Sequence, residues 1–178
     1  MLKQGTGTVL AIVLIIVAII FIVKYNGLVA KQEALEKSWA PLQMKLKQRY
    51  SPIPRLIADV TAYVGKKPDI AKELESDLEN VSKIKGISEA VDFANQVETD
   101  LTQLGQWLKE RYPGIISRYP VGVIADTMSQ TATTLGPEEM AFNKAAEEYN
   151  SYARRFPNNI VALVLFFPTT YQYYQPKT

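Results

Sequence analysis

The stretch Val9–Val23, VLAIVLIIVAIIFIV, decides how this chain is organised. It holds fifteen apolar residues in a row, and the uncharged region around it widens to residues 4–23, between Lys3 and Lys24. Twenty residues of α-helix measure about 30 Å, which is the thickness of the hydrocarbon core of a bilayer. We therefore predict a transmembrane helix, with Val9, Ile15, Ile19 and Val23 inside the span.

A cleaved secretory signal is the alternative interpretation of the same stretch. Signal peptides end in small residues at the cleavage site, whereas Lys24, Tyr25 and Asn26 follow here. The chain also has no cysteine that could carry a lipid. These features favour an uncleaved, single-pass anchor. Lysines are more numerous just after the span than before it, and this bias predicts that the body of the protein lies in the cytoplasm.

Composition argues against an enzyme. About 150 residues follow the anchor, enough for one domain with one hydrophobic core. The chain has no histidine and no cysteine, so the usual general base, the thiolate nucleophile and the commonest zinc ligands are missing. The 20 basic and 18 acidic side chains nearly balance, which predicts no nucleic-acid partner. We expect no catalytic residue, no cofactor, no metal and no small-molecule substrate.

Four amphipathic segments follow the anchor and predict an all-α fold, in which the transmembrane helix leads into an antiparallel four-helix bundle. Apolar residues recur at helical spacing over 28–50, 53–84, 91–112 and 121–156. In the first segment one face carries Leu28, Leu35, Trp39, Leu42, Leu46 and Tyr50. The predicted organisation is a tail and anchor at 1–24, a bundle at 25–157 and an apolar and aromatic segment at 158–178.

Prolines and polar runs predict where these helices bend or break. Pro41 is expected to bend the first helix without ending it, and Ser51–Pro54 is expected to end it and start the second. The second segment, 53–84, should be one helix that is kinked or broken near Pro68. Ser88 is a candidate N-cap for the third helix, and the threonine-rich stretch Thr131–Pro137 should interrupt the fourth.

The C-terminal segment is expected to return to the membrane. If successive helices reverse direction, the fourth ends beside Tyr25, where the anchor leaves the bilayer. The run IVALVLFF at 160–167 has the character of a strand and is too short to span a bilayer. It either caps the open end of the core or lies in the lipid interface. The membrane-interface candidates are Lys24, Tyr25, Arg154, Arg155, Phe166, Phe167, Tyr171, Tyr173 and Tyr174.

Asn143 and Asn150 are seven residues apart and therefore lie on one face of the fourth predicted helix. One interpretation is a polar ladder that fixes the register of the helices or meets a partner. The other is a pair of buried amides whose hydrogen bonds are satisfied by backbone or side chains inside the bundle.

Short motifs occur in a fixed order over nearly the whole body of the chain. Their residues are Tyr25, Asn26, Arg49, Pro54, Tyr112, Pro113, Asn143, Tyr149, Asn150, Phe156 and Pro157. Over about residues 25–175 the chain resembles the LemA family of bacterial single-pass membrane proteins. The resemblance implies an antiparallel helical bundle in the bacterial cytoplasmic membrane, with no established enzymatic activity. One departure is Arg49-Tyr50-Ser51-Pro52, which stands where the family usually has Arg-Arg-Asp-Leu.

The resemblance also bears on function, because some relatives, the magnetosome membrane proteins, are linked to building internal membranes. It implies a scaffold that organises or remodels the bilayer, with lipid as its first partner. Gly7 and Ala11 form a small-residue pair in the span that could seat a helix of a second copy or of another membrane protein. A membrane-tethered sensor or adaptor that binds a protein partner through the bundle is the alternative.

Overall fold

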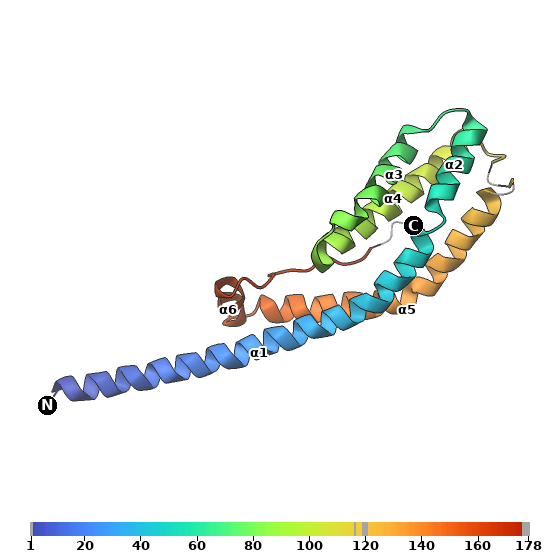
Figure 1. The fold of residues 1–178 in the computed structure, drawn as a ribbon. Helices are drawn as coiled ribbons and strands as arrows, with labels where there is room; N and C mark the ends of the chain where they lie inside the picture. Colours follow the sequence, from blue (N-terminus) through green and yellow to red (C-terminus); the bar gives the residue numbers. More distant parts are fainter. Residues whose placement is uncertain (1, 116, 119–120, 176–178) are drawn as a thin grey trace. The chain divides into compact units, whose positions relative to one another are not determined.

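The computed structural model describes residues 2–115, 117–118 and 121–175, and all regular structure within them is helical. The helices are α1 (Leu2–Tyr50), α2 (Ile53–Val64), α3 (Asp69–Asn80), η1 (Val81–Lys83, a 3₁₀ helix), α4 (Gly86–Arg111), α5 (Val121–Ala153) and α6 (Asn158–Val164) (Figure 1). The predicted all-α class and the long apolar N-terminal helix are therefore confirmed.

The chain forms two compact units. Unit 1 contains Met1–Glu36 and Ala145–Tyr171, and unit 2 contains Lys37–Lys144 and Gln172–Thr178. These units divide the chain at other positions than the predicted boundaries after residues 24 and 157. The last three residues of the predicted 158–178 segment lie outside the described residues.

Helix α1 is unbroken over 49 residues, so the apolar segment and the first amphipathic segment form one helix. Pro41 lies inside it and does not end it, as predicted. The predicted apolar face is correct throughout, because each of its members is buried: Leu28, Leu35, Trp39, Leu42, Leu46 and Tyr50.

Within unit 2 the chain reverses direction at 65–68 rather than at 51–54. Gly65 has a φ of 80° and ends α2 in the left-handed conformation that glycine adopts without strain. The ring of Tyr50 meets that of Phe93 at 6.5 Å, and the ring of Tyr63 meets that of Tyr112 at 6.0 Å. The end of α1 and the whole of α2 therefore follow α4 in the same direction. Ser51–Pro54 restarts the helix, because proline in the first turn needs no N–H partner.

Helix α4 begins at Gly86, earlier than the predicted cap at Ser88. Gly86 has a φ of 85°, and the carboxylate of Glu89 accepts a hydrogen bond of 2.7 Å from the backbone N–H of Lys85. This carboxylate satisfies one of the free donors at the start of the helix, so a serine cap is not needed. The face of α4 that was predicted to be apolar includes the buried residues Val91, Ala94, Val97, Leu104 and Leu108.

The predicted interruption of the fourth helix is wrong, because α5 continues through 131–137 with Pro137 inside it. The hydroxyl groups of Thr131, Thr133 and Thr134 donate hydrogen bonds of 2.7–2.9 Å to carbonyls three residues earlier. These bonds let threonine remain in a helix, where it otherwise competes with the backbone for hydrogen bonds. Leu135 is buried in the same stretch, so tertiary packing also favours the helix.

The run at 160–167 is not a strand. Residues 158–164 form the short helix α6, and the buried side chains Asn158, Val161 and Ala162 define its inner face. Their spacing of three and one is helical rather than alternating. The aliphatic composition of the run suggested a strand, but packing of this one face decided the structure.

Candidate functional site

The N-terminal half of α1 presents an apolar surface that no other described residue covers. An 18-residue window of this helix has a mean hydropathy of 2.9, and none of it is buried. The predicted span residues Val9, Ile15, Ile19 and Val23 are all exposed. This helix is long and apolar enough to cross a membrane, and a signal sequence near the N-terminus has the same length and composition.

Immediately after the apolar segment, α1 packs closely on α5 within unit 1. A Cβ built on Gly27 would lie 2.0 Å from Tyr152 Oη, so the two helices meet at the glycine. One turn further on, Lys31 Nζ lies 2.7 Å from a carboxylate oxygen of Glu148. The close approach holds the end of α5, and therefore the start of the C-terminal segment, beside the end of the apolar segment.

Helix α6 lies at the same end of unit 1. The side chain of Asn158 donates a hydrogen bond of 2.8 Å to the backbone carbonyl of Tyr152. The ring of Phe167 packs edge-on against that of Tyr25 at 5.8 Å. The predicted return of the chain to Tyr25 is therefore confirmed for Phe167.

The outer surface around α6 is strongly apolar. Phe166 is 94% exposed, Phe156 80% and Leu163 71%. Phe166 has a φ of 57°, a left-handed conformation that is costly for an aromatic residue. Large apolar side chains are normally buried, so this exposed surface is a candidate binding site. We call it the α6 surface and define it as Phe156, Ile160, Leu163, Val164, Leu165 and Phe166.

Cationic side chains lie next to the α6 surface in the sequence. Arg154 and Arg155 are the first two residues after α5, and both are exposed. Arg154 also donates a hydrogen bond of 3.0 Å to the hydroxyl of Thr170. Lys24 lies one residue before Tyr25, whose ring Phe167 contacts. Unit 1 thus combines apolar and basic groups, as interfacial membrane segments do.

The three C-terminal tyrosines of the predicted membrane interface are placed differently. Tyr171 and Tyr174 are buried in protein, so their rings are not free to meet lipid headgroups. Tyr171 packs its ring 4.8 Å from that of Tyr149. Tyr173 is partly exposed and its carbonyl is bound by Asn95. For Tyr171 and Tyr174 this corrects the prediction, because the chain turns into protein after Phe167.

Three asparagines hold the main chain of this C-terminal segment. In unit 1, Asn150 donates to the carbonyl of Tyr171 at 2.9 Å and accepts from its N–H at 2.7 Å. In unit 2, Asn143 makes the same pair of bonds to Tyr174, at 2.8 and 2.9 Å. Asn95 donates to the carbonyl of Tyr173 at 2.9 Å and accepts from the N–H of Gln175 at 2.8 Å.

These bonds decide between the two interpretations of Asn143 and Asn150. Both amides are satisfied within the chain, through backbone atoms of the C-terminal segment. A side-chain amide has one donor group and one acceptor. It can therefore bind both the carbonyl and the N–H of one residue, as a residue of a neighbouring antiparallel strand does. The segment 171–175 therefore stays extended although no strand lies beside it among the described residues.

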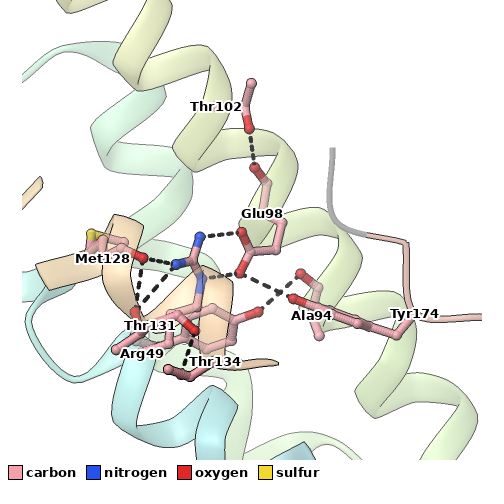
Figure 2. Close-up of polar contacts among 9 residues, drawn as sticks. Arg49, Ala94, Glu98, Thr102, Met128, Thr131, Thr134 and Tyr174 are labelled. Atoms are coloured by element: carbon pink, nitrogen blue, oxygen red, sulfur yellow. Dashed lines mark hydrogen bonds and ion pairs between the residues drawn. The ribbon is translucent and has the colours of Figure 1, made fainter. Parts of the chain in front are cut away.

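A largely buried ion pair, Arg49–Glu98, joins α1 to α4 within unit 2 (Figure 2). Arg49 Nε and Nη2 donate to the two carboxylate oxygens of Glu98 at 2.7 and 2.8 Å. Arg49 Nη1 also donates to the backbone carbonyl of Met128, and the hydroxyl of Tyr174 lies 3.4 Å from Glu98 Oε1. A bidentate pair with further hydrogen bonds satisfies both buried charges.

Electrostatics in this cluster follow from burial and from the carboxylate. Burial opposes the charge on Arg49, but the hydrogen bond and the charge of Glu98 outweigh it and raise the pKa of the guanidinium. Burial, with the negative charge of Glu98, raises the pKa of the hydroxyls of Tyr50 and Tyr174. Both phenols therefore stay protonated, and the hydrogen bonds of this cluster join α1, α4 and α5.

An open cavity of about 600 Å³ adjoins the ion pair between α4 and α5. Gly105 lines it, and nothing lies within 4 Å of the position of its Cβ. Most of the remaining lining is apolar: Leu56, Leu101, Leu104, Leu108, Val121, Ala125, Met128, Ala132 and Leu135.

The LemA family model matches residues 38–178, which is most of the chain and all of unit 2 except Lys37. The chain belongs to the LemA family. No curated protein matches it. The family match begins after Tyr25 and Asn26, although both of these residues were quoted for the resemblance.

Most of the LemA motif residues lie at helix ends or make contacts within the protein. Pro54 lies in the first turn of α2, and Tyr112 follows α4 with its ring 5.3 Å from that of Trp107. Pro113 lies in the turn after Tyr112. Tyr149 is buried and donates a hydrogen bond of 2.7 Å to the carbonyl of Pro168. Asn26 is exposed on α1, and Pro157 precedes α6.

Sequence reasoning missed Asn95 and Glu98. Glu98 follows Val97 on the apolar face of α4, and Arg49 lies beside Leu46 and Tyr50 on the apolar face of α1. A charged residue on each of two buried faces indicates an ion pair, and this signal could have found Glu98. Asn95 carried no comparable signal, because its partners are main-chain atoms.

Proposed function

We propose that this LemA protein is a non-enzymatic scaffold of the bacterial cytoplasmic membrane that contacts the bilayer in two places. In this proposal the apolar part of α1 spans the membrane, and the α6 surface lies in the lipid interface beside the point where α1 leaves it. The helical body, an antiparallel four-helix bundle, lies in the cytoplasm. Copies assemble with one another and so organise or remodel the membrane.

The single observation that carries this proposal is the exposed α6 surface beside Tyr25. Leu163 and Phe166 are more than two-thirds exposed, and Phe167 of the same segment contacts Tyr25, two residues after the apolar stretch. A helix of 7 residues cannot span a bilayer, so lipid contact would be at the interface. Arg154 and Arg155 suit that depth, because basic side chains interact with anionic headgroups.

The non-enzymatic part of the proposal is supported by composition. The full sequence has neither histidine nor cysteine. The pKa of Tyr50, Tyr149 and Tyr174 is raised chiefly by burial, so these hydroxyls stay protonated and are poor nucleophiles.

The cavity beside Gly105 favours a second candidate function, a tethered adaptor. Its apolar lining and open mouth suit a side chain or a helix face of a protein partner. On this alternative the protein works as single anchored copies, and the α6 surface binds protein rather than lipid.

Single-cysteine labelling tests the lipid contact, because the natural chain has no cysteine. A polarity-sensitive fluorophore is attached at Leu163→Cys in the full chain, reconstituted in liposomes with anionic lipid. Ile15→Cys in the predicted span and Met140→Cys, a 74% exposed position of unit 2, serve as controls. We expect blue-shifted emission at 163, quenched by lipids spin-labelled near the headgroup. Emission and quenching like those at 140 would exclude the interface contact.

Assembly is tested separately with the same reconstituted protein. The scaffold predicts particles much larger than one chain in detergent and altered liposome shape by electron microscopy. A monodisperse monomer with unchanged liposomes, together with labelled lipid contact at 163, would reject the scaffold and leave the tether.

A further inference from the structure

The cavity between α4 and α5 combines apolar walls with carboxylate groups. Its volume of about 600 Å³ lies within the range of small-molecule sites, about 300–1,000 Å³. Gly105 and Ala125 line it, and their small size leaves the space open. Glu98 and Glu139 also line it, and Gly105 follows Glu98 by seven residues, or about 10 Å along α4. All of the lining residues belong to unit 2, so the cavity lies within one compact unit.

Glu139 is a carboxylate without a cation among the described residues. The neighbouring carboxylates are neutralised, because Glu98 pairs with Arg49 (Figure 2) and Glu138 pairs with Lys45 at 2.9 Å. No described residue forms an ion pair or a hydrogen bond with the side chain of Glu139. Partial burial and the nearby charge of Glu98 raise the pKa of the Glu139 carboxyl. A cation in the cavity would offset both effects.

Lys109 also lines the cavity, but it is the weaker of the two candidate binding groups. It is exposed, so water solvates its ammonium group, and an ion pair with a ligand anion would gain little there. Glu139 is only partly exposed, and the attraction between opposite charges strengthens as water is excluded. The charges of the cavity therefore favour a cationic ligand over an anionic one.

We propose that this cavity binds a small organic cation, an alkylammonium ion whose charge meets Glu139 and whose apolar chain lies against Leu104 and Met128. Both of these apolar side chains are buried, and both line the cavity. Burial of the chain supplies affinity, because apolar surface leaves water, and the carboxylate supplies selectivity for the cation. The compound is a ligand that leaves unchanged, so the non-enzymatic proposal is unaffected. Its binding depends neither on lipid contact at the α6 surface nor on self-assembly.

Methionine-methyl NMR of the full chain in lipid nanodiscs tests this. Met128 lines the cavity and reports on it, whereas Met44 is 60% exposed, lies outside the lining and serves as the control. Hexylamine, hexanol and hexanoate are titrated at pH 7, where they share one chain and differ in charge. We expect hexylamine to shift the Met128 signal saturably, with Met44 unchanged, and to bind about tenfold or more tightly than the other two. Equal binding of the three compounds, tighter binding of hexanoate, or no saturable shift at Met128 would overturn the proposal.

Two pairs of variants assign the binding to the cavity. Glu139→Gln keeps the size of the side chain and should weaken hexylamine about tenfold while leaving hexanol unchanged, whereas Glu147→Gln, exposed on the same helix, should change neither. Gly105→Leu fills the space and should abolish binding of all three compounds, and Gln103→Leu, exposed on α4 outside the lining, is its control. Natural affinity for hexylamine in Glu139→Gln would overturn the proposal. Each of these results leaves the lipid contact at Leu163 to its own labelling test.

Discussion

Gly27 of α1 lies directly against Tyr152 of α5: a Cβ on the glycine would stand 2.0 Å from Tyr152 Oη and 2.6 Å from Cζ. No real Cβ contact is that short, so any larger residue at 27 must displace the tyrosine. This contact therefore determines where α5 packs against α1, just after the apolar segment.

We predict that Gly27→Ala destabilises unit 1 by about 1–3 kcal/mol, the usual cost of an added methyl group in a well-packed contact. Faster amide hydrogen exchange in residues 28–36 and 145–152 measures it. Gly105→Ala is the matched control, since nothing lies within 4 Å of its Cβ and alanine is the better helix former by up to about 1 kcal/mol. Equal effects at both positions would contradict the close contact.

Removing one member of the Arg49–Glu98 pair should lower the free energy of unfolding far more than removing both. Arg49→Met leaves the carboxylate buried without its cation, and we expect a loss of about 3–5 kcal/mol. Arg49→Met combined with Glu98→Leu should recover most of it. Urea unfolding followed by the fluorescence of Trp39 and Trp107, both in unit 2, gives the values. Additive losses in the double variant would reject the coupling.

Asp100 should make the fold less stable at neutral pH. Its side chain is buried, and its Oδ2 has no hydrogen-bond partner among the described residues. Burial raises the pKa of this carboxyl, and the nearby Asp77 and Glu73 raise it further, against the amide of Gln96. The folded state therefore binds the proton more tightly than the unfolded state, and this site gains stability as the pH falls through the raised pKa.

Asp100→Asn tests this sign. The variant should be more stable than the natural protein at pH 7, and the difference should shrink as the pH is lowered until Asp100 is protonated. Urea midpoints across a pH series measure it. A variant that is less stable at pH 7 would show that the ionised carboxylate is stabilising instead.

The two hydrogen bonds between the Asn150 side chain and the backbone of Tyr171 should hold the C-terminal segment in unit 1. Asn150→Ala leaves the N–H and carbonyl of the buried Tyr171 without their partners, which costs about 1–3 kcal/mol for each unsatisfied group. We expect rapid hydrogen exchange at the Tyr171 amide. Asn150→Asp keeps the acceptor for that N–H but loses the donor to the carbonyl, so its effect should be smaller. Unchanged hydrogen exchange at the Tyr171 amide in both variants would show that these two hydrogen bonds are dispensable.

Periodicity carried the sequence predictions that were confirmed. The buried face from Leu28 to Tyr50 and the long helices follow from apolar spacing alone, because burial of one face outweighs local exceptions such as Pro41. The family was also found from short motifs in order. Local breaker signals did worse: Pro137 does not interrupt α5, where Leu135 is buried and threonine hydroxyls bond to the helix backbone.

The path of the chain after Phe167 could not be predicted. Tyrosine is common at membrane interfaces, and for this reason the sequence favoured lipid contact for Tyr171 and Tyr174. Their burial follows instead from the hydrogen bonds that Asn150, Asn143 and Asn95 make to this segment. Because the asparagines bind backbone atoms, which every residue has, the sequence of the bound segment carries no pattern that would predict these contacts. The ion pair differs, since Arg49 and Glu98 both interrupt apolar faces and could have been matched.

Recognition through peptide groups has a further consequence for how this chain can diverge. The side chains of Gln172 and Gln175 are exposed, and the backbone N–H of Gln175 is bound by Asn95, so substitutions at these two positions should leave the buried Tyr174 in place. Sequence change at this end of the chain is therefore constrained at Tyr174 and not at the two glutamines, and the segment keeps its place on its own helices while its outer side chains vary.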